Sequence, residues 1–330
     1  MLLTELLARN ATNYGDEISL IELNPSVEDK TDLKWQEYEL VEGGRSVHFR
    51  RELTWREFDD TANRVANMLR AKGIRKGEKV AILLMNCLEW LPIYFGILRS
   101  GATVVPLNFR YTSEEIEYCL NLADVSVLIF GTEFTERISP IKQMLSKIEQ
   151  YIFVGMDVPE YAFSYEKENV KFPSDKPDVD IREEDDAAIY YSSGTTGFPK
   201  AILHTQSSLY SAAETEYAHH QQKKDDVFIL IPPLYHTGAK MHWFGNLMSA
   251  GRTIILKGAD PKWILETAAS EKATIVWLLV PWAQDILEVI ESGEIDLEHL
   301  DLHCWRLMHI GAQPVPPSLI HRWKTHFPHH

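Results

Sequence analysis

The chain has 330 residues, of which 45% are hydrophobic and 25% are charged, and its formal net charge is -15. This composition excludes a disordered chain, and the length suffices for two subdomains or one large α/β unit. The negative charge argues against general binding to nucleic acid or to an anionic membrane, so a phosphate site would have to be built locally.

From Leu53 onward, helical and strand patterns alternate. A helix is predicted after Thr54, because Thr54 and Glu57 have capping-box spacing and apolar residues then recur at helical intervals until Gly73. Further helices are predicted at 89–99 and after Thr112, and unbroken apolar runs predict strands at 80–84, 102–106 and 125–130. Such strands between amphipathic helices indicate an α/β fold with parallel sheets covered on both faces.

The polar segment 166–186 contains two prolines and is the best candidate for a boundary between subdomains. We therefore predict a first α/β subdomain at 1–170 and a second at 171–330. Strands resume after the boundary at 187–191, 227–231, 253–256, 274–278 and 306–310. The first 45 or so residues show no clear pattern, and the chain has no internal repeat.

Residues 192–200 read SSGTTGFPK and lie between two predicted strands, 187–191 and 201–204. Two glycines allow a tight backbone whose N–H groups approach a ligand, while four hydroxyls and Lys200 add donors and a positive charge. Such a loop suits a polyphosphate. An ordinary Gly/Ser/Thr turn is the alternative, although a turn has no need of so many donors or of a lysine. The spacing differs from that of the P-loop.

Residues 190–200, YYSSGTTGFPK, resemble the signature of the adenylate-forming superfamily, which includes acyl-CoA synthetases, luciferases and peptide-synthetase adenylation domains. The resemblance implies the large N-terminal domain of that fold and a loop around the β- and γ-phosphates of ATP. It assigns phosphate binding to Ser192, Ser193, Gly194, Thr195, Thr196, Gly197 and Lys200. Thr196 and Lys200 would also act in catalysis, with Thr196 holding Mg²⁺. Ala201 stands where many members have glycine.

Two further segments agree with this resemblance. Residues 233–238, PLYHTG, look like a family element whose histidine, here His236, lies between acyl group and nucleotide and is implied to be catalytic. Gly311, Ala312 and Gln313 follow a predicted strand and resemble the family turn that passes over adenine. Alone, either segment would be an unremarkable loop.

Residues expected to border the acyl group lie in two segments after predicted strands, and they are Tyr235, His236, Met241, Val280 and Trp282. Simple core packing is the alternative for any one of them. Together they favour an apolar aliphatic or aromatic carboxylate. The aspartate by which adenylation domains hold an amino group is absent from 234–238, which argues against an amino-acid substrate.

The resemblance implies an AMP-forming acyl-CoA ligase that uses ATP, Mg²⁺ and coenzyme A and proceeds through an acyl-adenylate. It covers the chain from about Leu53 to His330, whereas family members continue beyond that point. We therefore expect a truncated piece with little activity of its own. A non-catalytic nucleotide-binding short form, an amino-acid adenylation domain and a luciferase-like enzyme remain alternatives.

The sequence gives less information about cellular location and oligomeric assembly. The three cysteines, Cys87, Cys119 and Cys304, are widely separated, which is typical of thiols in a reducing compartment. No apolar run is long enough to span a membrane, and we expect a cytoplasmic protein that is compatible with a homodimer. The thirteen histidines show no recognisable metal-ligand spacing, so no structural metal is expected.

Overall fold

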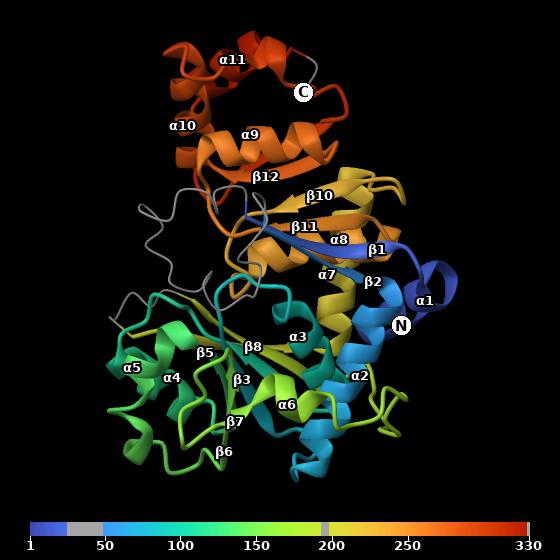
Figure 1. The fold of residues 1–330 in the computed structure, drawn as a ribbon, viewed down its shortest axis with the longest axis vertical. Coiled ribbons are helices and arrows are strands. Elements are labelled where there is room, and N and C mark those ends of the chain that lie inside the picture. The colour runs from blue at the N-terminus through green and yellow to red at the C-terminus, as the bar shows by residue number, and fades with distance from the viewer. Residues whose placement is uncertain (25–48, 193–197, 329–330) are drawn as a thin grey trace.

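The computed structural model describes residues 1–24, 49–192 and 198–328. Two β-sheets lie one above the other with helices between them, and further helices cover the outer side of each sheet (Figure 1). The central strands of each sheet are therefore buried on both faces, as their unbroken apolar sequences require, whereas the edge strand at 200–205 is largely exposed. The predicted α/β class is confirmed.

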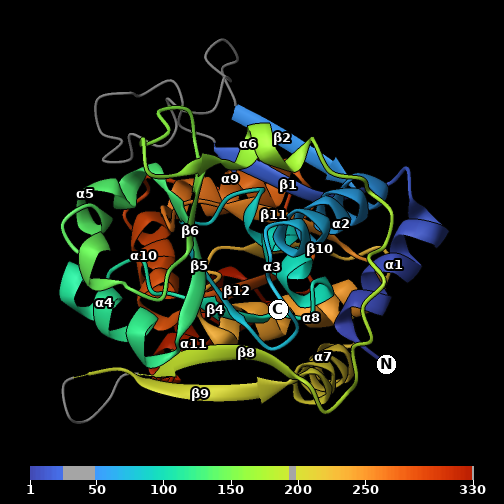
Figure 2. The same ribbon diagram turned by 90° about the horizontal axis from the view of Figure 1, so that it is seen from below.

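The seven-stranded sheet has the order β7-β6-β5-β3-β4-β8-β9. Its neighbouring strands are parallel except that β9 runs antiparallel to β8 at the edge. The strands are β3 (Lys79–Leu83), β4 (Thr103–Pro106), β5 (Val125–Gly131), β6 (Gln150–Val154), β7 (Phe163–Ser164), β8 (Asp186–Ser192) and β9 (Lys200–Thr205). Figure 2 shows β8 and β9 as a hairpin along this edge, beside α7.

The six-stranded sheet has the order β13-β12-β10-β11-β1-β2. Only β2 is antiparallel to its neighbour. The strands are β1 (Ile18–Asn24), β2 (Phe49–Thr54), β10 (Val227–Leu230), β11 (Arg252–Leu256), β12 (Ile275–Leu279) and β13 (Leu307–Gly311). The alternation along β12 and β13 sends odd-numbered side chains toward the inner helices and even-numbered ones toward the outer helices.

The helices form three groups, as the three hydrophobic cores show. The inner core joins both sheets to α1 (Leu3–Tyr14), α2 (Trp55–Ala71), α3 (Trp90–Arg99), α7 (Gln206–His220) and α8 (Thr237–Ser249). One outer core packs α4 (Ser113–Leu122) and α5 (Thr135–Ile138) on the seven-stranded sheet. The other packs α9 (Pro261–Ser270), α10 (Val280–Glu291) and α11 (Pro317–His326) on the six-stranded sheet. The short helix α6 (Tyr165–Asn169) follows β7.

The predicted capping boxes are confirmed. The side chain of Thr54 accepts from the backbone N–H of Glu57 at the start of α2, and Thr112 accepts from Glu115 at the start of α4. The helix α2 ends before Gly73, which has a φ of 96°. Local signals therefore placed these helices correctly.

The expected boundary at residue 170 does not coincide with the division of the strands between the two sheets. Strand β8 lies beyond it, yet Ala188 pairs with Val104 of β4 in the first sheet. Strand β1 lies near the N-terminus, yet it pairs in parallel with β11 in the second sheet. The physical reason is that sheet membership depends on long-range strand pairing, which a polar segment in the sequence does not reveal. The N-terminal helix α1 and strand β1 were also missed.

Candidate functional site

The predicted phosphate loop is the turn of the β8–β9 hairpin. Ser192, the last residue of β8, pairs with Lys200, the first residue of β9, and the side chain of Lys200 is exposed. The structure thus confirms the predicted strand-loop-strand arrangement. Ser193, Gly194, Thr195, Thr196 and Gly197 lie outside the described residues.

Aromatic side chains hold the hairpin onto the body of the protein. The hydroxyl groups of Tyr190 and Tyr94 are 2.8 Å apart, and the hydroxyl of Tyr191 donates to the carbonyl of Cys119 at 2.6 Å. Beyond the turn, the ring of Phe198 lies 4.6 Å from that of Tyr118. Because burial raises the pKa of Tyr190 well above its usual value, its hydroxyl stays neutral. Both ends of the loop are therefore attached to fixed points.

His236 occupies the N-cap position of α8, in the segment that follows β10, and its side chain makes no capping hydrogen bond. Its ring lies 4.6 Å from that of Tyr235, which in turn meets Phe109 edge-on at 5.2 Å. Removal from water, together with the charges of Lys240 and Arg110, lowers the pKa of His236. The imidazole is therefore neutral at pH 7 and can accept or donate a hydrogen bond.

Lys240 connects this segment to the hairpin. It is fully buried, and its side-chain nitrogen donates to the carbonyl of Leu234 at 2.5 Å. The same nitrogen lies 4.2 Å from the ring centre of Tyr190 and 5.0 Å from that of Trp90. Burial lowers the pKa of Lys240 well below its usual value. No earlier sequence signal had singled out this residue.

The segments predicted to carry function all follow the carboxyl ends of strands. Ser192 ends β8, His236 comes after β10, and Gly311 ends β13. After Gly311 the backbone turns at Ala312, which has a φ of 67°, and Gln313 is exposed. Ligands of open α/β sheets bind at these carboxyl ends, so the topology favours a common ligand region.

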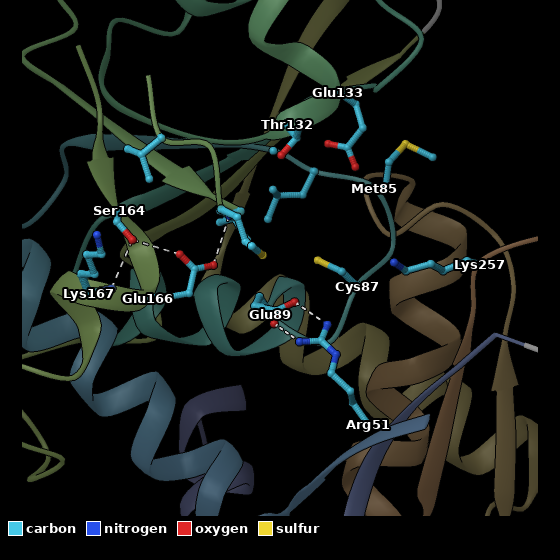
Figure 3. A pocket seen from close by; sticks show the side chains of 16 residues that line it. Arg51, Met85, Cys87, Glu89, Thr132, Glu133, Ser164, Glu166, Lys167 and Lys257 are labelled. Atoms are coloured by element: carbon cyan, nitrogen blue, oxygen red, sulfur yellow. Dashed lines mark hydrogen bonds and ion pairs between the residues drawn. The ribbon is translucent and has the colours of Figure 1, made fainter. Parts of the chain in front are cut away.

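Two adjoining cavities lie at the same ends. The larger, of about 580 Å³, opens after β3, β5 and β6, and Figure 3 shows Cys87 and Lys257 among the side chains that line it. The smaller, of about 240 Å³, is lined by Asn86, Phe109 and Trp282, and both share Met85 and Lys257. A crevice thus runs between the two sheets.

A network of four charges crosses this crevice. Glu22 is fully buried and pairs with both Arg51 and Lys257, the latter at 2.7 Å. Arg51 also binds Glu89 at 2.5 Å, as the dashed lines in Figure 3 indicate. Although burial acts to raise it, the charge of Arg51 holds the pKa of Glu89 below its usual value. Strands of one sheet are thereby tied to α3.

The residues expected around an acyl group lie in different places. Trp282 lines the smaller cavity, and Tyr235 packs on Phe109 at its wall. Met241 packs partly buried against the inner core, whereas Val280 is buried in the outer core of the six-stranded sheet. The structure therefore brings Tyr235 and Trp282 toward one cavity and leaves Val280 as a core residue.

Three histidines meet in a cluster that sequence spacing did not reveal. His220 ends α7, His242 lies on α8 and His309 lies on β13, and their nitrogens come within 4.8 Å of one another. Burial, and then the rings of His242 and His220, lower the pKa of His309 to about 4. No local spacing could have found the cluster, because its members are 22 and 67 residues apart in the printed sequence.

Solved structures share this fold. An anthranilate CoA ligase, AuaEII, in complex with anthranoyl-AMP is 25% identical with a TM-score of 0.84, over 98% of this chain and 57% of that chain. The N-terminal domain of FACL13 from Mycobacterium tuberculosis is 23% identical with a TM-score of 0.82, over 99% and 73% respectively. The fold is therefore that of the N-terminal domain of adenylate-forming enzymes.

A family model described as AMP-binding enzyme matches residues 33–330. The chain belongs to this family of AMP-binding enzymes, and the resemblance seen in the sequence is confirmed.

Long-chain-fatty-acid--CoA ligase FadD13 of Mycobacterium tuberculosis is 27% identical over 78% of this chain and 50% of its own length. Feruloyl-CoA synthase of Amycolatopsis is 28% identical over 79% and 49%. The chain spans about half the length of these curated relatives. In the described part of the chain, no helix has the length and apolarity to cross a bilayer.

Proposed function

We propose that this chain belongs to an AMP-forming acyl-CoA ligase. A carboxylate oxygen would attack the α-phosphorus of ATP, giving an acyl-adenylate and pyrophosphate. The thiolate of coenzyme A would then attack the acyl carbon and release AMP, leaving a thioester. The relatives named as CoA ligases support this proposal, and so does the family match.

The single observation that carries the proposal is the position of Lys200. Lys200 is exposed and is the first residue of β9. It pairs with Ser192 at the carboxyl end of β8, where the loop leaves the sheet. Because the attacking carboxylate and the triphosphate are both anions, their approach needs a cation and aimed donors. Lys200 and the loop hydroxyls would supply them. The magnesium ligand assigned by resemblance, Thr196, lies outside the described residues, and bound Mg²⁺ would add charge neutralisation at the phosphates.

His236 would act between the acyl group and the nucleotide. It follows β10 and packs beside Tyr235, whose partner Phe109 lines the smaller cavity with Trp282. A neutral imidazole at this position can hydrogen-bond an oxygen of the carboxylate without forming a competing ion pair. Gly311, Ala312 and Gln313 are proposed to pass over the adenine.

An apolar aliphatic or aromatic acid is the proposed substrate. Phe109 and Trp282 give the smaller cavity, of about 240 Å³, aromatic walls, and hydrophobic and aromatic linings are typical of small-molecule pockets. Relatives named for long-chain fatty acids and for feruloyl and anthranoyl groups support a carboxylate of this class.

Carboxylate-dependent exchange of pyrophosphate into ATP, measured with the complete gene product, tests the proposal. Aliphatic, aromatic and dicarboxylic acids are compared, and at least one apolar acid is expected to support exchange. Exchange without any thioester on adding coenzyme A would instead indicate another adenylate-forming enzyme. Nucleotide binding without exchange for any acid would favour a non-catalytic binding protein and refute the ligase.

A further inference from the structure

The histidine cluster has a geometry that the ligase reaction does not explain. Nε2 of His220 lies 3.0 Å from Nδ1 of His309, and Nε2 of His242 lies 3.1 Å from the same atom. His242 is buried, and the other two rings are partly buried. Three ring nitrogens therefore point at one small volume between α7, α8 and β13.

The three ring nitrogens that face one another have too few N–H protons to be joined by hydrogen bonds alone. Nδ1 of His242 lies 2.8 Å from the carbonyl oxygen of Gly238, and Nδ1 of His220 lies 3.1 Å from a carboxylate oxygen of Glu216. The carbonyl oxygen of Gly238 only accepts, so His242 carries its proton on Nδ1 and presents a lone pair at Nε2. The nearby carboxylate of Glu216 favours the same tautomer for His220, although Nδ1 of His220 has no aligned hydrogen-bond partner. His309 can then donate one proton to only one of the two lone pairs. The carboxylate of Glu216, 3.6 Å from Nε2 of His242, adds further negative charge.

A divalent transition-metal ion would satisfy this arrangement. Zinc binds imidazole nitrogen at about 2.0–2.1 Å in tetrahedral sites, which places two ligand nitrogens about 3.3 Å apart. Two of the three separations, 3.0 and 3.1 Å, are close to that value, and all three ligand nitrogens lie within 4.8 Å of one another. Neutral imidazoles are also the ligands that zinc, copper and nickel prefer among nitrogen donors.

The surroundings have the features of a built metal site. Metal-binding histidines commonly donate their second N–H to a carboxylate or a backbone carbonyl. The carbonyl of Gly238 has this role for His242, and a carboxylate oxygen of Glu216 lies 3.1 Å from Nδ1 of His220. The backbone at His220 is also fixed, because Arg306, just before β13, donates to its carbonyl at 3.3 Å and pairs with Asp226 at 2.6 Å. The side chains of His220 and His242 are 12% and 10% exposed to solvent, so an ion can reach them.

We propose that Nε2 of His220, Nε2 of His242 and Nδ1 of His309 bind one zinc-class divalent cation, with the fourth position open to water. The ion would join α7, α8 and β13 two residues before Gly311, a segment proposed to pass over adenine. The proposal is independent of the ligase function, since it concerns only these side chains.

Metal binding to the chain purified without an added histidine tag and freed of metal by chelation tests the proposal. Titration with Co²⁺ should give the intense visible absorption of a four-coordinate site at one equivalent, and Zn²⁺ should displace it. Zn²⁺ should also raise the thermal midpoint of unfolding, because it binds only the folded cluster. Absence of a saturable one-equivalent spectrum in the unmodified chain would overturn the proposal.

Variants locate the ion. His242→Gln and His309→Gln should each abolish the one-equivalent spectrum, and Glu216→Gln should weaken binding about 10- to 100-fold. His219→Gln is the matched control, because this exposed neighbour of His220 lies outside the cluster. All variants keep the histidines at 326, 329 and 330, so any binding there is common to them. Circular dichroism of the metal-free variants checks folding, and an unchanged spectrum in folded His242→Gln and His309→Gln would refute the assignment.

Discussion

Ser192 and Lys200 are directly paired across the antiparallel β8–β9 ladder, so the hydroxyl-rich loop leaves and re-enters the sheet at a single point. This pairing sets the spacing between the start of the loop and its lysine. Tyr190 then attaches that point to the inner core, and Tyr191 attaches it to the outer core of the seven-stranded sheet.

Replacing Lys200 with alanine should slow pyrophosphate exchange about 10²- to 10³-fold, because one aimed charge at the phosphates is lost. Stability should change by less than about 0.5 kcal/mol, since the side chain is exposed. Exchange kinetics and urea unfolding measure the two effects. Lys324→Ala, an exposed lysine on α11, is the control. An unchanged rate in Lys200→Ala would remove the proposed role of the loop.

Glu22→Gln should destabilise the fold by about 3–5 kcal/mol, because it leaves the buried charges of Arg51 and Lys257 less compensated. Chemical denaturation measures the loss. Asp180→Asn breaks an exposed ion pair with Arg182 and should cost less than about 1 kcal/mol. Similar losses in the two variants would contradict a network whose importance comes from burial.

Lys240→Met should change how stability depends on pH. Burial lowers the pKa of Lys240 in the folded state, so between that pKa and 10.5 the unfolded chain binds a proton that the folded chain does not. The stability of the unmodified chain therefore rises with pH in this window, by up to about 1.4 kcal/mol per pH unit. Denaturation at pH 7, 8 and 9 should show a shallower slope for Lys240→Met. The exposed control Lys324→Met should keep the original slope, and equal slopes for all three chains would disprove the depressed pKa.

Trp282→Ala should enlarge the smaller cavity and shift the preference among acids toward longer or bulkier chains. Hydrophobic pockets discriminate by about 10- to 200-fold per methylene group, so a change of about 10-fold in the ratio of kcat/KM values is expected. Exchange rates across an acid series measure it. Phe163→Ala, on exposed β7, should leave the ratio as it was. If Trp282→Ala leaves the ratio unchanged, the smaller cavity does not bind the acyl group.

Local sequence signals predicted the fold where short-range physics decides it. The caps at Thr54 and Thr112, the strand-loop-strand form around 192–200 and the parallel α/β class were all readable, because capping, side-chain periodicity and turn chemistry act over a few residues. The motif in 190–200 also identified the family.

Tertiary structure alone decided which distant elements meet. The pairing of β1 with β11, the return of β8 to the first sheet, and the burial of Val280 in an outer core follow from strand order, which local patterns do not encode. For the same reason, the histidine cluster could not be predicted from local sequence patterns. His220, His242 and His309 come from two helices and a strand, and only the packing of α7 and α8 on β13 turns three unrelated residues into one cluster.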